Sequence, residues 1–217
     1  MPLLSHQDEQ VLTQHLSAID NRVTILLFTQ AIGGSESGPV AKQILGEIAR
    51  LNDKVTVVEK SFVLDTEDRA KYGVAHAPGI VFLSNDEDTR MRMYGAPTGY
   101  EFVSLVEGIL IAGTRKHDLS EDSVALLATV SEPMQLQVFS TPTCPHCPKA
   151  VVLAFKMAFA NPSITATAIE AIEFMELSRQ YRVTGVPKTI VNEGIEILGA
   201  LPEDEFVRSA LQISDTA

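Results

Sequence analysis

Residues 139–148 read Phe-Ser-Thr-Pro-Thr-Cys-Pro-His-Cys-Pro, and they include both cysteines of the chain. The apolar segment at their start predicts a strand that ends in a Thr-Pro-Thr turn, and the periodicity after them predicts a helix over residues 148–160. Cys144 then stands just before a helix N-terminus, where unpaired backbone N–H groups and the helix dipole favour a thiolate. A thiolate with a second thiol close by predicts thiol–disulfide exchange.

The chain also contains an internal repeat. Tyr-Gly-Val at 72–74 and Ala-Pro at 77–78 correspond to Tyr-Arg-Val at 181–183 and Val-Pro at 186–187, with an offset of 109 residues. The same offset relates Pro39 to Pro148. A constant offset from residue 39 to residue 78 implies two copies of one unit. Cys144 maps onto Ser35 and Cys147 onto Gly38, so the first unit has no thiol pair.

Both units predict the same order of elements. The expected helices cover residues 8–18, 40–51 and 101–111 in the first unit and 121–130, 149–159 and 203–211 in the second, with a short acidic helix that ends at Tyr72 or Tyr181. The expected strands cover residues 23–28, 55–59 and 79–83, then 136–139, 164–169 and 189–191, and a last strand leads to Gly95 or Gly199. Strands that alternate with helices predict an α/β fold in each half. The periodicity breaks over residues 113–120, so we expect domains at residues 1–115 and 116–217.

Composition limits the possible partners and locations. The 217-residue chain is 45% hydrophobic and has a net charge of −11, which argues against nucleic acid and anionic membranes as partners. We expect no signal peptide and no transmembrane segment, because the sequence lacks the long apolar runs that either requires. A cytoplasmic location follows as the default. In that reducing compartment a lone CxxC is more typical of catalysis or metal binding than of a structural disulfide.

These motifs resemble the thioredoxin/glutaredoxin superfamily. Within it, the chain looks like the tandem-domain protein disulfide oxidoreductases. Four stretches carry this resemblance: residues 141–148, Glu-Ala-Ile-Glu-Phe at 170–174, Gln-Tyr-Arg-Val-Thr-Gly-Val-Pro-Lys at 180–188 and Tyr-Gly-Ala-Pro-Thr-Gly-Tyr-Glu-Phe at 94–102. The plan of the chain is also similar to the N-terminal domain of the alkyl hydroperoxide reductase flavoprotein, which pairs a thiol-free unit with a CxxC unit. The resemblance implies two tandem thioredoxin-like domains, each with a central mixed β-sheet flanked by helices.

The CxxC motif suggests a division of roles. We expect Cys144, at the exposed end of the loop, to attack a substrate disulfide, and we expect the better covered Cys147 to resolve the mixed disulfide. Pro145 and His146 are expected to tune the pair, because proline restricts the loop and histidine can place a positive charge beside the thiolate. The alternative for His146 is a solvent-exposed loop residue with no electrostatic role.

The resemblance assigns a substrate role to Val186 and Pro187. Their peptide bond is expected to be cis, and the backbone of Val186 is expected to offer hydrogen bonds to an extended substrate strand. The alternative is an ordinary trans proline at the start of a strand. Ala77-Pro78 is the matching bond of the first unit, where only a structural use is expected.

A proton relay is harder to locate. Thioredoxin has a buried acid at the position of Val138, and this chain has none there. Glu170 and Glu173 are the nearest candidates, although we favour the interpretation that they are solvated charges. Lys188 is expected to pair with one of these two acids or with the substrate.

The resulting hypothesis is a thiol–disulfide oxidoreductase that reduces protein disulfides and binds no cofactor besides its own redox-active disulfide. The alternative is a dedicated electron-transfer adaptor between a thioredoxin-reductase-like flavoprotein and a peroxiredoxin. In that case loop 33–38 and the acidic surface serve docking; otherwise the loop is a decayed active site. We expect no metal site, because structural zinc needs four ligands and the histidines outside the CxxC show no ligand spacing.

Overall fold

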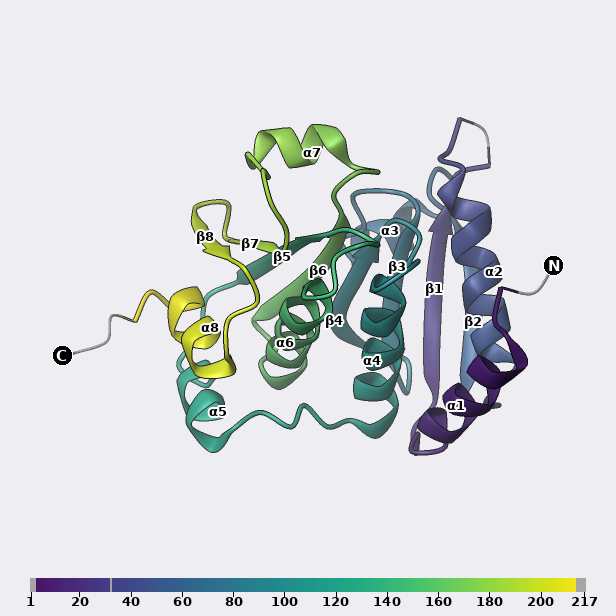
Figure 1. Cartoon of the computed structure of the whole chain (residues 1–217), viewed down its shortest axis with the longest axis horizontal. Coiled ribbons are helices and arrows are strands. Elements are labelled where there is room, and N and C mark those ends of the chain that lie inside the picture. The colour runs from purple at the N-terminus through teal and green to yellow at the C-terminus, as the bar shows by residue number, and fades with distance from the viewer. Residues whose placement is uncertain (1–2, 32, 214–217) are drawn as a thin grey trace.

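The computed structural model describes residues 3–31 and 33–213 and shows an α/β arrangement (Figure 1). The strands are β1 (Val23–Thr29), β2 (Val55–Ser61), β3 (Gly79–Ser84), β4 (Glu87–Tyr94), β5 (Met134–Ser140), β6 (Ile164–Glu170), β7 (Lys188–Val191) and β8 (Ile195–Leu198). The helices are α1 (His6–Leu16), α2 (Ser37–Ala49), α3 (Thr66–Lys71), α4 (Glu101–Thr114), α5 (Glu121–Leu127), α6 (Cys147–Ala160), α7 (Met175–Gln180) and α8 (Glu203–Ala210). The predicted order of elements is confirmed in both units.

All eight strands form one sheet, in the order β2-β1-β3-β4-β6-β5-β7-β8. In each half a parallel pair continues into two antiparallel strands, so both halves contain the mixed sheet that was predicted. The halves meet where β4 and β6 pair in parallel, from Met91 opposite Ala166 to Tyr94 opposite Ile169. The two units therefore share a continuous sheet, which the sequence had not indicated.

Helices cover the two faces of this sheet unequally. One face packs against α2, α4 and α6, and Phe82 of β3 meets Phe155 of α6 with ring centroids 5.8 Å apart. Residues of α1, α5 and α8 extend the same apolar core. The opposite face packs against the segments around α3 and α7, in a second cluster that includes Phe28 and Phe139. Successive side chains of a strand point to opposite faces of the sheet, so Met91 and Met93 of β4 both face the first core.

One edge of the sheet collects the loops that matter for function. Strands β1, β4, β6 and β5 run in one direction, so the loops that follow β1, β4 and β5 all lie at this edge. The peptide bonds Ala77-Pro78 and Val186-Pro187 are both cis, as predicted, and they precede the antiparallel strands β3 and β7. They lie at the same edge, so both units direct their corresponding loops to one side of the molecule.

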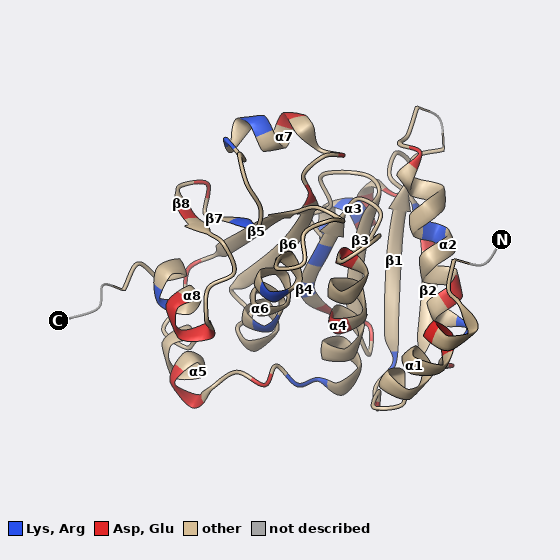
Figure 2. Cartoon of the chain, viewed as in Figure 1, with Lys and Arg blue, Asp and Glu red and all other residues tan. Residues whose placement is uncertain are grey.

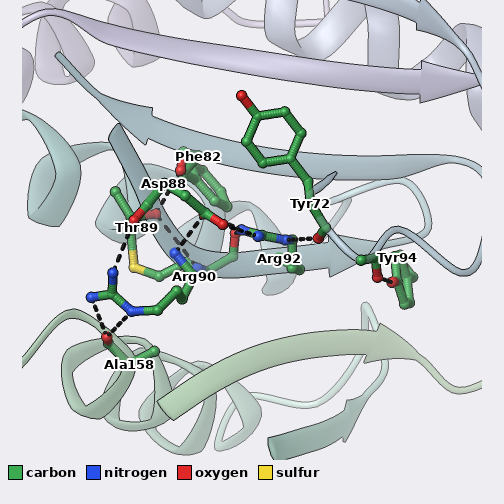
Figure 3. A network of polar contacts seen from close by, with 10 residues as sticks. Tyr72, Phe82, Asp88, Thr89, Arg90, Arg92, Tyr94 and Ala158 are labelled. Atoms are coloured by element: carbon green, nitrogen blue, oxygen red, sulfur yellow. Dashed lines mark hydrogen bonds and ion pairs between the residues drawn. The ribbon is translucent and has the colours of Figure 1, made fainter. Parts of the chain in front are cut away.

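The junction between the units contains two arginines on β4 (Figure 3). The register between β3 and β4 shifts, and Arg90 has a left-handed backbone with φ of 64°. Its Nε and Nη2 donate to the carbonyl oxygen of Ala158, at 3.1 and 2.8 Å, at the C-terminal end of α6. Arg92 instead forms a bidentate pair with Asp88, at 2.8 and 2.6 Å. A side chain of the first unit therefore caps the helix that begins at Cys147.

Candidate functional site

Cys144 and Cys147 are joined by a disulfide, with their Cα atoms 5.5 Å apart. Cys147 is the first residue of α6, and its backbone N–H donates to the sulfur of Cys144 at 3.1 Å. Cys144 is 8% exposed and Cys147 is 1% exposed. The expected order of exposure is correct, but Cys144 is mostly buried rather than exposed. A helix N–H directed at the sulfur of Cys144 stabilises a thiolate there when the bond is reduced.

Pro145 and His146 lie at the surface between the two cysteines. His146 is the residue before the first turn of α6, and its side chain makes no capping hydrogen bond. An electrostatic role for His146 and a conformational role for Pro145 stay predictions.

Val186 and Pro187 directly precede β7, which pairs with β5, the strand that leads into the CxxC loop. Pro187 is buried, and its carbonyl oxygen accepts from the N–H of Gly199 at 2.9 Å. Val186 precedes β7, so its backbone lies outside the ladder of the sheet. Val186 and Thr141, which lies in the turn before Cys144, line one groove of about 590 Å³. The backbone of Val186 therefore lies on the same groove as the turn before Cys144, and substrate binding there stays a prediction.

The first unit keeps the shape of such a site without the thiols. A pocket of about 500 Å³ is lined by Ala77, Pro78 and residues of the loop after β1, which include Ser35 and Gly38. The loop is two residues longer than its counterpart, because β1 and β5 correspond at an offset of 111 whereas the later elements correspond at 109. The extra length explains why the repeat is recognisable only from Pro39 onward.

Three acidic side chains gather behind the CxxC loop, and the interpretation of two of them as solvated charges is wrong. Glu101 and Glu170 are each 4% exposed. Glu170 ends β6 and accepts from the N–H groups of Ile172, at 3.2 Å, and Glu173. Glu173 accepts from the N–H of Ala96 at 2.8 Å, and its other carboxylate oxygen is buried without a partner among the described residues. Burial raises the pKa of Glu170.

Glu101 is the residue that sequence reasoning missed. It accepts a hydrogen bond from the hydroxyl of Ser140, the last residue of β5, four positions before Cys144. Burial raises its pKa to about 8, and the neighbouring carboxylates of Glu170 and Glu173 act in the same direction. Glu101 therefore holds a proton near neutral pH yet releases it within reach of physiological conditions.

The loop before α4 fixes Glu101 at this place. The N–H of Tyr100 donates to the carbonyl oxygen of Pro142 at 2.8 Å. Gly99 has φ of 55°, and a Cβ there would lie 2.3 Å from the same oxygen, so only glycine permits this approach. The first unit thus places its own acid behind the turn that carries the thiols of the second unit.

Lys188 does not pair with Glu170 or Glu173, so that alternative is wrong, whereas a contact with the substrate stays a prediction. It is 4% exposed, and its Nζ lies 2.9 Å from Oε1 of Glu196 on β8. Nζ also donates to the carbonyl oxygens of Tyr181, at 2.8 Å, and Arg182, at 3.3 Å. Lys188 therefore fixes the turn after α7, and its strand β7 lies on the other side of β5 from β6, which ends at Glu170.

Metal binding and membrane insertion are two further possibilities for residues 3–31 and 33–213. No group of three or more His, Cys, Asp or Glu side chains in these ranges is arranged to hold a metal ion. None of the helices described combines the length and the apolar character needed to cross a membrane. The dithiol and the buried acids behind it remain the chemically distinctive cluster.

A mixed sheet with a CxxC at a helix start and a cis-proline at the same end is the arrangement of the thioredoxin fold, to which the chain is similar. Residues 134–212 match the family model of a thioredoxin domain. The fold occurs here twice, in tandem.

Relatives and solved structures narrow the similarity. The chain is 27% identical over 190 residues to the AhpF protein of the alkyl hydroperoxide reductase of Staphylococcus epidermidis, which covers 88% of this chain and 34% of that protein. The corresponding Escherichia coli protein is 27% identical over 151 residues, covering 70% of this chain and 27% of that protein. The chain thus spans about a third of the length of the curated relatives it matches.

Two solved structures share the tandem fold. The NTD_N/C domain of alkyl hydroperoxide reductase AhpF from Enterococcus faecalis superposes with a TM-score of 0.89 at 22% identity, covering 95% of this chain and 99% of that one. A protein disulfide oxidoreductase from Aeropyrum pernix superposes with a TM-score of 0.87 at 23% identity, covering 95% and 91%. The similarity to these structures concerns the fold.

Proposed function

We propose that the chain transfers electrons to protein disulfides through the single dithiol of Cys144 and Cys147. The observation that carries this proposal is the disulfide at the first turn of α6, with the N–H of Cys147 directed at the sulfur of Cys144. The position of Val186 supports it, because this residue lies just before β7, outside the sheet ladder, where a substrate strand can pair with its backbone.

The reaction proceeds in two exchanges. The Cys144 thiolate attacks one sulfur of the substrate disulfide; a new S–S bond forms, the substrate bond breaks, and the leaving thiolate takes up a proton. Cys147 then loses its proton and attacks the sulfur of Cys144. The mixed disulfide breaks, the second substrate thiol is released, and Cys144–Cys147 is left oxidised. Two electrons pass from the dithiol to the substrate.

We assign the proton transfer at Cys147 to Glu101. A group whose pKa is close to the working pH can both accept and return a proton, and the pKa of Glu101 is about 8. Ser140 holds this carboxyl beside the strand that leads to the CxxC. The first unit would then serve the chemistry of the second, even though it has no thiols.

The roles of the cysteines are tested by trapping. Cys147→Ser should accumulate mixed disulfides through Cys144, whereas Cys144→Ser should neither reduce nor trap substrates. In the reduced protein, mild alkylation should modify Cys144 first, because Cys147 is the less exposed thiol. Preferential modification of Cys147 would reverse the assignment.

Two alternatives remain for the partners of the chain: many protein disulfides, or one flavoprotein and one peroxiredoxin. The structural similarity to a protein disulfide oxidoreductase suggests a general reductase. The match of 88% of the chain to an AhpF protein of alkyl hydroperoxide reductase favours the adaptor, which takes electrons from a thioredoxin-reductase-like flavoprotein and gives them to a peroxiredoxin. A cytoplasmic location remains a prediction from the sequence.

Reduction assays distinguish the two. The pre-reduced chain is mixed with insulin in one assay, and in a second it is mixed with a peroxiredoxin encoded in the same genome. Comparable rates on both support the general reductase. Fast reduction of the peroxiredoxin with negligible reduction of insulin supports the adaptor, and failure with both removes the proposed function.

A further inference from the structure

We propose that Arg179 and Arg182 make the groove beside the CxxC selective for disulfides flanked by acidic side chains. The inference rests on the proposed function and names the class of substrate that this site prefers. It concerns the groove between α7 and the segment before Pro187, which Arg179 and Arg182 both line.

The groove combines apolar and cationic side chains. Ile172 and Met175 line it and are 63% and 54% exposed, a large exposure for apolar side chains next to a reactive group. Thr141 and Val186 connect this surface to the CxxC turn and to the cis bond. A polypeptide that reaches Cys144 along Val186 therefore passes over the apolar side chains.

The two arginines carry charges that the chain does not neutralise. Both are exposed, and no ion pair joins either of them to a carboxylate among the residues that the structure describes. Figure 2 shows basic and acidic segments together on α7, whereas α5 and α8 carry mostly acidic ones. In a chain with a net charge of −11, unpaired cations at the site are available to an acidic partner.

The internal repeat provides a comparison within the same molecule. At the offset of 109 residues, Arg179 corresponds to Ala70 and Arg182 to Gly73. Gly73 has φ of 62° and Arg182 has φ of 50°, a left-handed conformation that suits glycine and is uncommon for other residues. The second unit, which has the thiols, thus has Arg182 in a left-handed conformation, whereas the first unit has Gly73, the residue type that this conformation favours. Strain retained beside a reactive site points to a use for the side chain.

The buried lysine below the turn supports the same inference. Nζ of Lys188 holds the carbonyl oxygens of Tyr181 and Arg182, and Glu196 balances its charge. The backbone that presents the Arg182 guanidinium is therefore fixed before a partner arrives. A positioned cation loses less conformational freedom on binding than one on a mobile loop.

The test uses the pre-reduced full chain and three synthetic peptides. Each peptide has one intramolecular disulfide and the same apolar residue beside it, and the two flanking residues are both Glu, both Gln or both Lys. Rates of reduction are measured at 0.15 M salt, where the Debye length of about 8 Å screens the overall negative charge of the chain more than the groove itself. We expect the Glu peptide to react faster than the Lys peptide by on the order of tenfold.

The variants separate local from overall charge. Arg179→Glu with Arg182→Glu should invert the preference, whereas Arg50→Glu with Lys116→Glu changes the net charge equally, far from the groove, and should keep it. Arg182→Gly restores the residue of the first unit. This variant should lower the ratio of the reduction rates of the Glu and Lys peptides. It should not lower the midpoint of thermal unfolding. If Arg182 had only a structural role, the midpoint would fall and the ratio would not change.

Two results overturn the inference alone: equal rates for the three peptides with the wild-type chain, or a preference that persists in Arg179→Glu with Arg182→Glu. If the wild-type chain reduces none of the peptides, the proposed function fails and this inference fails with it. The inference is supported if Arg179→Glu with Arg182→Glu inverts the preference for the Glu peptide and Arg50→Glu with Lys116→Glu keeps that preference.

Discussion

Glu101 contributes to the way in which the stability of the folded chain depends on pH. Its pKa is about 8 in the folded chain because burial disfavours the carboxylate, whereas the ordinary value is 4.5. Between these values the folded state binds more protons than the unfolded state, so stability falls as pH rises through this window. Below about pH 4.5 and above about pH 8, Glu101 no longer changes the free energy of unfolding as pH changes.

Glu101→Gln should therefore flatten the pH dependence of unfolding. Each pKa unit corresponds to about 1.4 kcal/mol, so from pH 5 to pH 9 the variant should lose several kcal/mol less stability than the wild-type chain, as an order of magnitude. Urea unfolding of the disulfide form at intervals across this range measures the effect. Glu121→Gln, on the exposed start of α5, is the control and should keep the wild-type slope. Parallel curves for Glu101→Gln and the wild-type chain would contradict the assignment.

His146 allows a second prediction at this scale. If its charge stabilises the Cys144 thiolate, His146→Ala should slow alkylation of the reduced protein at neutral pH by a few-fold, since reactivity follows the thiolate fraction. Stopped-flow alkylation with Cys147→Ser as background isolates Cys144. Unchanged rates would leave thiolate stabilisation to the N–H of Cys147.

The two reactive cysteines are easier to predict from the sequence than the buried acid behind them. Cys144 and Cys147 are recognisable because they are the only thiols and lie at a helix start. Glu101 is not, because Glu203 begins the last helix of the second unit in the same way, and an acid in a first turn is ordinary. The contacts that distinguish Glu101 from Glu203, namely the approach of Gly99 to Pro142 and the hydrogen bond from Ser140, are visible only in the folded chain.

At the scale of elements, α6 depends on both units. Its N-terminus carries Cys147, and its C-terminal carbonyl oxygen at Ala158 accepts two N–H groups of Arg90 from β4. The bulge that turns Arg90 this way has no signature in the strand pattern. The order of the elements was predictable from the repeat, whereas the pairing of β4 with β6 was not, because a repeat says nothing about contacts between its copies.

Arg90→Gln should destabilise the chain by about 1–3 kcal/mol, because a buried carbonyl at the end of α6 loses charged donors. Urea unfolding measures the loss, and hydrogen exchange should show faster opening in the last turn of α6. Arg22→Gln is the matched control: it removes an exposed pair with Asp86 and should change stability by less than about 0.5 kcal/mol. Equal losses in both variants would contradict a special role for Arg90.

At the scale of the whole molecule, the proposed domains at 1–115 and 116–217 share a sheet and a core, and a buried acid of the first contacts the second. β6 pairs with β4, Phe155 packs on Phe82, and Glu101 reaches the strand before the CxxC. Residues 115–120 connect α4 to α5 at the edge opposite α7 in Figure 1. The covalent link is therefore distant from the loops that carry the chemistry.

This arrangement predicts different outcomes for cutting the link and for removing a unit. A chain cleaved at an engineered protease site within residues 115–120 should stay together and reduce insulin at the full rate, because the shared sheet holds the units. A fragment of residues 113–217 exposes the β6 edge and Phe155, so it should self-associate or unfold at lower urea. It also lacks Glu101, so any remaining reduction should be slower. Size-exclusion chromatography with light scattering, urea unfolding and insulin reduction measure these effects. A monomeric fragment as stable and as active as the full chain would show that the first unit is dispensable for folding and for insulin reduction, and would remove the assignment of Glu101.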